Sequence, residues 1–334
     1  MTEAFPARIV GGYRSGKTTA LQKLAATLPE PLVVCATEAA AAAFGFGATT
    51  FWGLAADVLA RHDRPVRVLS TAEQRARFDD PALAHAVCHY QASFLGLEEL
   101  RTHAHAAGSA AAWETVAAAA ESYLTDLSAR GEADWAGVLV QASLLLRDER
   151  VLAAERSRWS HVLVDDFEAA SFACNRLLTQ LAGFGGPVAV AGNPANDVWR
   201  HLGGSPRYLD RFPRRFGAAG EATLSQSFPA ARSGSAVLVL EPGGDPWLPR
   251  PDGPIPVALS TSLSWAEVQV VAGASTDAVE KGPYDLDLLA GPDVPDELER
   301  RERRRREDEA RLALARSRAV AVQTVVQPPS TAST

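Results

Sequence analysis

The sequence predicts an α/β fold in which a parallel β-sheet carries a long helical insertion. Two short apolar stretches near the N-terminus, residues 7–10 and 31–36, have the character of buried strands, and helical spacing follows each of them. Two further apolar stretches, residues 161–164 and 187–191, run into polar turns as central parallel strands do. Strand–helix–strand order implies right-handed crossovers, so we expect these strands to form one parallel sheet.

The rest of the chain divides into a part with helical apolar spacing and a part with a different amino-acid composition. From residue 50 to 158 the apolar spacing is almost wholly helical. After about residue 235 the chain becomes rich in Pro and Gly. We therefore expect a first domain over residues 1–235, with a helical insertion at about 70–158, and a second domain over residues 236–334. The charge-dense stretch 296–311 predicts a solvated helix in that second domain.

Length and composition limit the class of protein. The 334 residues leave room for about two domains. A hydrophobic fraction of 47% and a charged fraction of 22% are typical of a globular protein and exclude a disordered or collagen-like chain. The 33 Lys and Arg residues against 40 Asp and Glu residues give a net charge of −7. Nucleic acid would therefore have to bind in a local basic groove rather than through bulk charge.

Cysteine usage and hydropathy indicate a cellular setting. Cys35, Cys88 and Cys174 stand far apart, without the spacing of a disulfide framework or of a structural zinc site. The first residues lack the basic flank and apolar core of a secretory signal, and no apolar run is long enough to span a bilayer. We therefore expect a cytoplasmic protein with no membrane partner.

A glycine-rich loop joins the first predicted strand to the first predicted helix. Residues 11–18 match the pattern G-x-x-x-x-G-K-[ST]. In such a loop, backbone amides face phosphates, Lys17 reaches the β- and γ-phosphates, and Thr18 offers its hydroxyl to Mg²⁺. An ordinary glycine turn with a chance Lys-Thr pair is the structural alternative. The predicted ATP site consists of Gly11, Gly12, Ser15, Gly16, Lys17, Thr18 and Thr19.

Two acidic residues, Asp165 and Asp166, follow the strand predicted at residues 161–164. A phosphate-binding loop needs a carboxylate for Mg²⁺ at the end of a neighbouring strand, and Asp165 supplies one. Asp166 is then expected to orient or polarise the water that attacks the γ-phosphate. Paired acids after a strand also cap the following helix, which is the structural alternative.

The order of these motifs resembles a known family. The phosphate loop, the string Val164-Asp-Asp-Phe-Glu168 and the string Ala191-Gly-Asn-Pro-Ala-Asn-Asp-Val-Trp-Arg200 resemble the first motor domain of superfamily 1 DNA helicases of the UvrD/Rep type. Residues 67–74 and 133–139 resemble actinobacterial members, including the motor subunits of the AdnAB helicase-nuclease. The resemblance implies a RecA-like P-loop NTPase sheet with a curtailed second RecA-like lobe, ATP hydrolysis coupled to single-stranded DNA, and a role in DNA repair.

Several positions depart from the family pattern. Asp166 stands where the family has a catalytic Glu, and Asn196 stands at the position of the Gln that senses the γ-phosphate. A misplacement of about 1 Å can cost roughly 10²-fold in rate. Pro229 replaces an arginine of the family, and an arginine finger supplies on the order of 10³–10⁵ in rate. The resemblance makes Arg316 a second arginine finger and places Phe228 where the family has a Tyr, to stack on adenine or to pack in the core.

The DNA-binding positions of the family are replaced as well. A Lys, an aromatic residue and a His of the family correspond to Ala39, Ala36 and Trp52. Residues 199–216 interleave aromatic and cationic side chains, as a groove for stacked single-stranded bases would. The same spacing fits an amphipathic helix that buries its aromatic side chains while its arginines face water.

Two main interpretations of function follow. The first is an ATP-binding, UvrD-like DNA helicase-family protein with Mg²⁺-dependent ATP hydrolysis of reduced activity, coupled to single-stranded DNA. Its predicted catalytic residues are Asp166, Asn196 and Arg316, and its Mg²⁺ ligands are Thr18 and Asp165. The alternative is a catalytically weak pseudo-helicase, a nucleotide-binding scaffold or partner of a complete helicase or nuclease. A small kinase or NTPase outside the helicases is a third interpretation, for which the sequence offers no substrate pocket.

Overall fold

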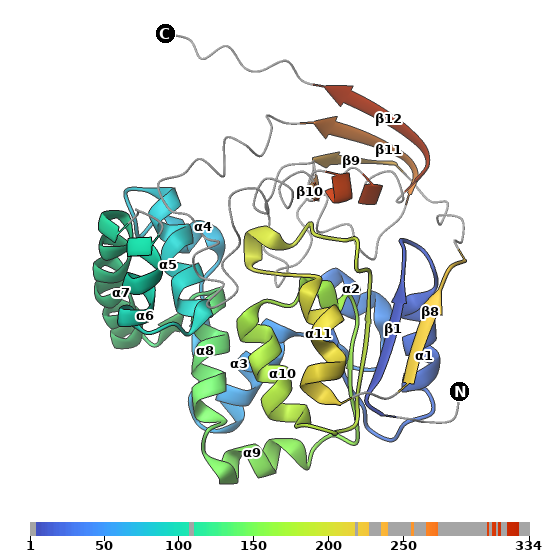
Figure 1. Ribbon diagram of the computed structural model, residues 1–334, viewed down its shortest axis with the longest axis horizontal. Coiled ribbons are helices and arrows are strands. Elements are labelled where there is room, and N and C mark those ends of the chain that lie inside the picture. Colours follow the sequence, from blue (N-terminus) through green and yellow to red (C-terminus); the bar gives the residue numbers. More distant parts are fainter. Residues whose placement is uncertain are drawn as a thin grey trace.

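The computed structural model describes residues 5–106, 110–217, 220–226, 235–239, 255–256, 265–272 and 319–326, and the helical residues 306, 309–311, 313 and 314. Figure 1 shows helices packed around a β-sheet, with a lobe of helices beside it. The predictions for Phe228 and Arg316 lie outside the described residues.

A six-stranded sheet forms the centre of the described N-terminal part. Its order is β3-β2-β6-β7-β1-β8, and all its pairings are parallel. The strands are β1 (Ala7–Gly11), β2 (Leu32–Cys35), β3 (Thr49–Thr50), β6 (Val162–Val164), β7 (Val188–Gly192) and β8 (Gly220–Leu224). The four predicted strands are the four inner ones, because strands covered on both faces read as continuous apolar runs. The predicted α/β fold is confirmed.

Helices cover both faces of this sheet (Figure 1). Successive strand residues point to opposite faces. Val33 and Leu163 belong to a core with α1 and α2, whereas Val34 and Val164 belong to a larger core with α3, α8, α10 and α11. Within the described residues of 5–217, the helices outside the insertion are α1 (Lys17–Ala25), α2 (Glu38–Phe44), α3 (Phe51–Arg61), α10 (Phe172–Ala182) and α11 (Arg207–Phe216), with the short helical turns η1 (Phe167–Ala169) and η2 (Arg200–Leu202).

The insertion between α3 and β6 is helical, as predicted, and builds part of its own core. Its helices are α4 (Thr71–Arg75), α5 (Pro81–Ser93), α6 (Leu97–Ala106), α7 (Ala110–Arg130), α8 (Trp135–Leu145) and α9 (Glu149–Arg156). Trp113, Leu100 and Val87 pack together there. Two short strands that were not predicted, β4 (Arg67–Val68) and β5 (Glu132–Ala133), pair in parallel. None of the described helices is long and apolar enough to cross a membrane.

A second, four-stranded sheet follows in the chain (Figure 1). Its order is β10-β9-β11-β12, with parallel pairings. The strands are β9 (Ser235–Val239), β10 (Ile255–Pro256), β11 (Trp265–Ala272) and β12 (Ala319–Val326). Strand β9 begins at Ser235, where the composition of the sequence changes to Pro- and Gly-rich. A domain boundary at this point remains a prediction.

The prediction of a solvated helix over residues 296–311 is wrong at its C-terminal end. Arg306 and Glu309 are exposed, but Ala310 and Arg311 are only 4% and 2% exposed. Ala310 and the nearby Leu314 pack into the larger core of the first sheet. The high density of charged residues in this segment led to the prediction of full exposure. A helix exposes only part of its circumference to water, so one face of a charge-rich helix can still be buried.

Candidate nucleotide-binding site

The loop between β1 and α1 has the backbone that a phosphate-binding loop requires. Gly16, directly before α1, has a left-handed conformation with φ of 86°. A Cβ on Gly11 would lie 2.7 Å from the backbone oxygen of Leu224 in β8, so a larger residue does not fit there. Arg14 has a positive φ of 56°, which is uncommon for a residue other than glycine. The loop is therefore a tight turn that runs straight into a helix N-terminus.

Polar side chains of this loop are buried. Lys17 is 8% exposed, and its Nζ donates a hydrogen bond of 2.8 Å to the backbone oxygen of Gly12. Ser15 is 5% exposed, and its hydroxyl has no hydrogen-bond partner among the described residues. A buried polar atom without a partner costs about 1–3 kcal/mol, so such an atom in a loop of this shape fits a phosphate ligand.

Thr18 and Asp165 meet where α1 begins and β6 ends. The Thr18 hydroxyl donates a hydrogen bond of 2.7 Å to Asp165 Oδ2, while Asp165 Oδ1 has no partner among the described residues. Burial, and then the charge of Asp166, raise the pKa of Asp165 to about 7. A hydroxyl beside a carboxylate with a spare oxygen is the donor set that Mg²⁺ uses in phosphate-loop sites. The residues present therefore fit this ion.

Asp166 follows in a left-handed conformation, with φ of 51° and ψ of 49°. It occupies the N-cap position of η1 but makes no capping hydrogen bond through its side chain. The structural alternative, that this residue caps the next helical turn, is therefore wrong. The partly buried carboxylate of Asp166 therefore remains available to interact with a ligand or a water molecule.

Glu168 was not among the predicted site residues, yet the structure places it beside them. It is 1% exposed, and its Oε1 accepts a hydrogen bond of 2.9 Å from Asn196 Nδ2. A Cβ on Gly192, at the end of β7, would lie 2.7 Å from Glu168 Oε2. Burial, and then the charge of Asp166, raise the pKa of Glu168 to about 8, while the charge of Lys17 acts to lower it. The signal in the sequence was a third acid within the Asp-Asp-Phe-Glu string.

Tyr13, in the middle of the loop, was also missed. Its hydroxyl lies 3.1 Å from Asn196 Oδ1 and 3.1 Å from the backbone oxygen of Ala310. Asn196 itself is 2% exposed. The structure thus brings the loop, the turn after β7 and the C-terminal helical residues together at one point.

Of the two interpretations of residues 199–216, the groove for stacked bases is not found among the described residues of this range. Trp199, Phe212 and Phe216 are buried in the core, whereas Arg214 and Arg215 are exposed. The amphipathic alternative is correct, because the apolar residues of α11 pack against the sheet. Trp52 and Ala36, at positions where the family contacts DNA, are each 5% exposed and belong to the same core.

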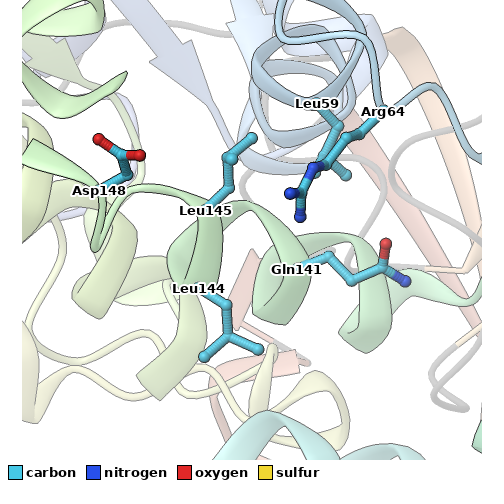
Figure 2. Close-up of a pocket in the computed structure, with 6 residues that line it drawn as sticks. All are labelled: Leu59, Arg64, Gln141, Leu144, Leu145 and Asp148. Atoms are coloured by element: carbon cyan, nitrogen blue, oxygen red, sulfur yellow. The ribbon is translucent and has the colours of Figure 1, made fainter. Parts of the chain in front are cut away.

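Other candidate sites do not coincide with the loop. A pocket between α3 and α8 is lined by none of the predicted site residues (Figure 2). Its lining consists of Leu59, Arg64, Gln141, Leu144, Leu145 and Asp148. Among the described residues, no group of three or more His, Cys, Asp and Glu could hold a metal ion.

A family model matches part of the chain. Residues 57–217, just under half of the 334 residues, match the UvrD/REP helicase N-terminal domain. The matched range begins in α3, after the phosphate loop, and includes Asp165, Asp166 and Asn196. This part of the chain is therefore similar to the N-terminal domain of UvrD-type superfamily 1 helicases. A comparison with curated proteins gives no match.

Solved structures of viral helicases also resemble the chain weakly. The arterivirus nonstructural protein 10 helicase with DNA is 12% identical, with a TM-score of 0.36 over 97% of this chain and 61% of that chain. The same helicase alone is 12% identical, with a TM-score of 0.35 over 97% and 60%. The PRRSV helicase is 10% identical, with a TM-score of 0.34 over 98% and 53%. The chain spans 53% to 61% of the length of these helicases, and likeness at this level adds nothing to the functional argument.

Proposed function

We propose that this chain binds ATP with Mg²⁺ in the loop of residues 11–18 and hydrolyses it, as the first motor domain of a UvrD-like DNA helicase does. The observation that carries the proposal is the 2.7 Å hydrogen bond between the Thr18 hydroxyl and Asp165. It joins the end of the phosphate loop to the end of β6, the two elements between which such enzymes hold Mg²⁺. The UvrD/REP model match supports the helicase part of the proposal.

The roles of the side chains follow from their positions. Lys17 exchanges its bond to the Gly12 carbonyl for the β- and γ-phosphates, and the loop amides with the Ser15 hydroxyl complete the phosphate cradle. Thr18 and Asp165 hold Mg²⁺, which when bound neutralises charge on the phosphate oxygens. Asp166 orients the attacking water.

Coupling to single-stranded DNA and a role in DNA repair are further parts of the proposal. The support for them is the similarity to UvrD-type helicases over residues 57–217. The buried aromatics of α11 leave the exposed Arg214 and Arg215 as the groups for a DNA backbone. We place the protein in the cytoplasm.

A second candidate function is a nucleotide-binding scaffold that pairs with a complete helicase or nuclease, as in the AdnAB-like arrangement. One observation favours it: Asn196 and Asp166 are each one methylene shorter than the Gln and the Glu that the family has at these positions. A misplacement of about 1 Å can cost roughly 10²-fold in rate, so the nucleotide could bind with little turnover. The two candidates differ in hydrolysis, not in binding.

The test combines calorimetry of ATP binding with phosphate release, each with and without Mg²⁺ and single-stranded DNA. We expect Mg²⁺-dependent binding, with turnover stimulated by DNA and abolished in Lys17→Ala. Lys23→Ala removes an exposed charge from the same helix and is the matched control. Binding without turnover would select the scaffold. Binding that Lys17→Ala leaves unchanged would refute both candidates.

A further inference from the structure

A chain of hydrogen bonds surrounds the Asn196 carboxamide. Its Nδ2 donates to Glu168 Oε1 over 2.9 Å, and its Oδ1 accepts from the Tyr13 hydroxyl over 3.1 Å. Glu168 belongs to η1 after β6, Asn196 follows β7, and Tyr13 belongs to the phosphate loop. Three segments from distant parts of the sequence therefore fix one side chain.

In the structure the nitrogen of this carboxamide faces Glu168 and its oxygen faces the Tyr13 hydroxyl. The same hydroxyl lies 3.1 Å from the backbone oxygen of Ala310. In the observed orientation one N–H of Asn196 is used by Glu168. The carboxamide has a second N–H, which is a donor for an oxyanion.

Burial makes this arrangement stiff. Asn196 and Glu168 are 2% and 1% exposed, so water does not compete for their bonds. A hydrogen bond in such surroundings is stronger than one in water, and an unmade one is costly. The side chain is thus held in place before any ligand arrives, which is what a group that reads a phosphate needs.

We propose that Tyr13 and Glu168 are positioning residues of the nucleotide site, which hold the Asn196 carboxamide so that its second N–H donates to the terminal phosphate of ATP. This inference rests on the proposed nucleotide-binding function. It gives this chain a preference for ATP over ADP that depends on Tyr13, at an unspecified position of the G-x-x-x-x-G-K-[ST] pattern, and on Glu168, which follows the Asp165-Asp166 pair.

The experiment measures dissociation constants of the full chain for ADP and for a non-hydrolysable ATP analogue with Mg²⁺. A hydrogen bond to a charged group corresponds to roughly a ten- to hundredfold change in affinity, and a change that acts through Asn196 should remove only part of it. We expect Tyr13→Phe and Glu168→Met to lower the preference for the triphosphate about tenfold or less while ADP binding is unchanged. Glu168→Gln keeps an accepting oxygen and should restore the preference lost in Glu168→Met. Tyr90→Phe, in α5, removes the same single oxygen and is the control.

Asn196→Ala separates a positioning role from a structural one. Once Asn196 is absent, Tyr13→Phe should have no further effect on the ratio of the two constants, because both changes act through the same side chain. An unchanged ratio in Tyr13→Phe, or effects that add to those of Asn196→Ala, would overturn the inference. Loss of ADP binding as well would show a merely structural role. If Lys17→Ala leaves both constants unchanged, the proposed function itself fails.

Discussion

The Glu168→Gln variant should become increasingly more stable than the wild type as the pH rises. Burial and the charge of Asp166 raise the pKa of Glu168 from 4.5 to about 8. Between these values the folded chain holds a proton that the unfolded chain has released, so the stability of the wild type falls with increasing pH. Gln has no proton to lose and keeps an oxygen for the Asn196 amide. The variant should therefore escape this loss.

The magnitude follows from the same shift. One proton held over one pH unit changes the free energy of unfolding by about 1.4 kcal/mol. We expect the variant to gain roughly 2–4 kcal/mol on the wild type between about pH 5 and pH 8. Urea unfolding followed by tryptophan fluorescence at several pH values measures this gain. Glu221→Gln, at a glutamate that is half exposed and bonded to Arg8, is the matched control.

The pH dependence of the stability difference between the variant and the wild type shows whether burial controls the pKa of Glu168. If Lys17 kept the Glu168 carboxylate ionised in the folded chain, Glu168 would be ionised in both the folded and the unfolded chain between pH 5 and pH 8, and the stability difference between the variant and the wild type would not change with pH there. A difference that stays constant or turns negative across this range would refute the reasoning about burial.

Three further predictions concern the loop, the insertion and the metal. Gly11→Ala should abolish ATP binding in a calorimetric titration, because its Cβ would lie 2.7 Å from a backbone oxygen of β8; retained affinity would contradict this. Glu155→Ala should lower the free energy of unfolding by about 2–4 kcal/mol in urea, since it leaves the half-buried Arg61 without its 2.7 Å partner; a smaller loss would mean that water replaces it. The affinity for Mg²⁺ with ATP should rise about tenfold between pH 6 and pH 8, because the pKa of about 7 keeps Asp165 protonated at the lower value; a flat profile would exclude it as the ligand.

The sequence predicts the inner strands better than the edges of the sheet. Three of the four inner strands, β2, β6 and β7, are buried along their whole length and read as unbroken apolar runs. At one edge β3 has only two residues, and at the other β8 alternates between half-buried and exposed positions. Neither leaves an apolar run to recognise. Local pattern therefore identified the centre of the sheet and not its width.

Some residues of the candidate site can likewise be found from local sequence patterns, and others cannot. The loop before α1 and its contact with Asp165 could be expected from the sequence, because the G-x-x-x-x-G-K-[ST] pattern and an acid after a neighbouring strand are both local signals. Tyr13 and Glu168 were not, because their roles depend on which segments meet in three dimensions. The burial of Ala310 was hidden for the same reason, since its neighbours in the sequence are charged.

The nucleotide side and the DNA side of the proposed function differ in how their described side chains are used. On the side of the nucleotide loop, buried polar atoms of Ser15 and Asp165 have no partner among the described residues. Each such atom costs about 1–3 kcal/mol unless a ligand completes it. On the side that would meet DNA, the side chains of Trp52 and Phe212 are buried in the core, so their rings are not accessible for stacking on a base. The unpartnered polar atoms thus support the proposed nucleotide site. Among the residues that the structure describes, the exposed Arg214 and Arg215 remain available for a DNA backbone, and salt would weaken such charge contacts steeply.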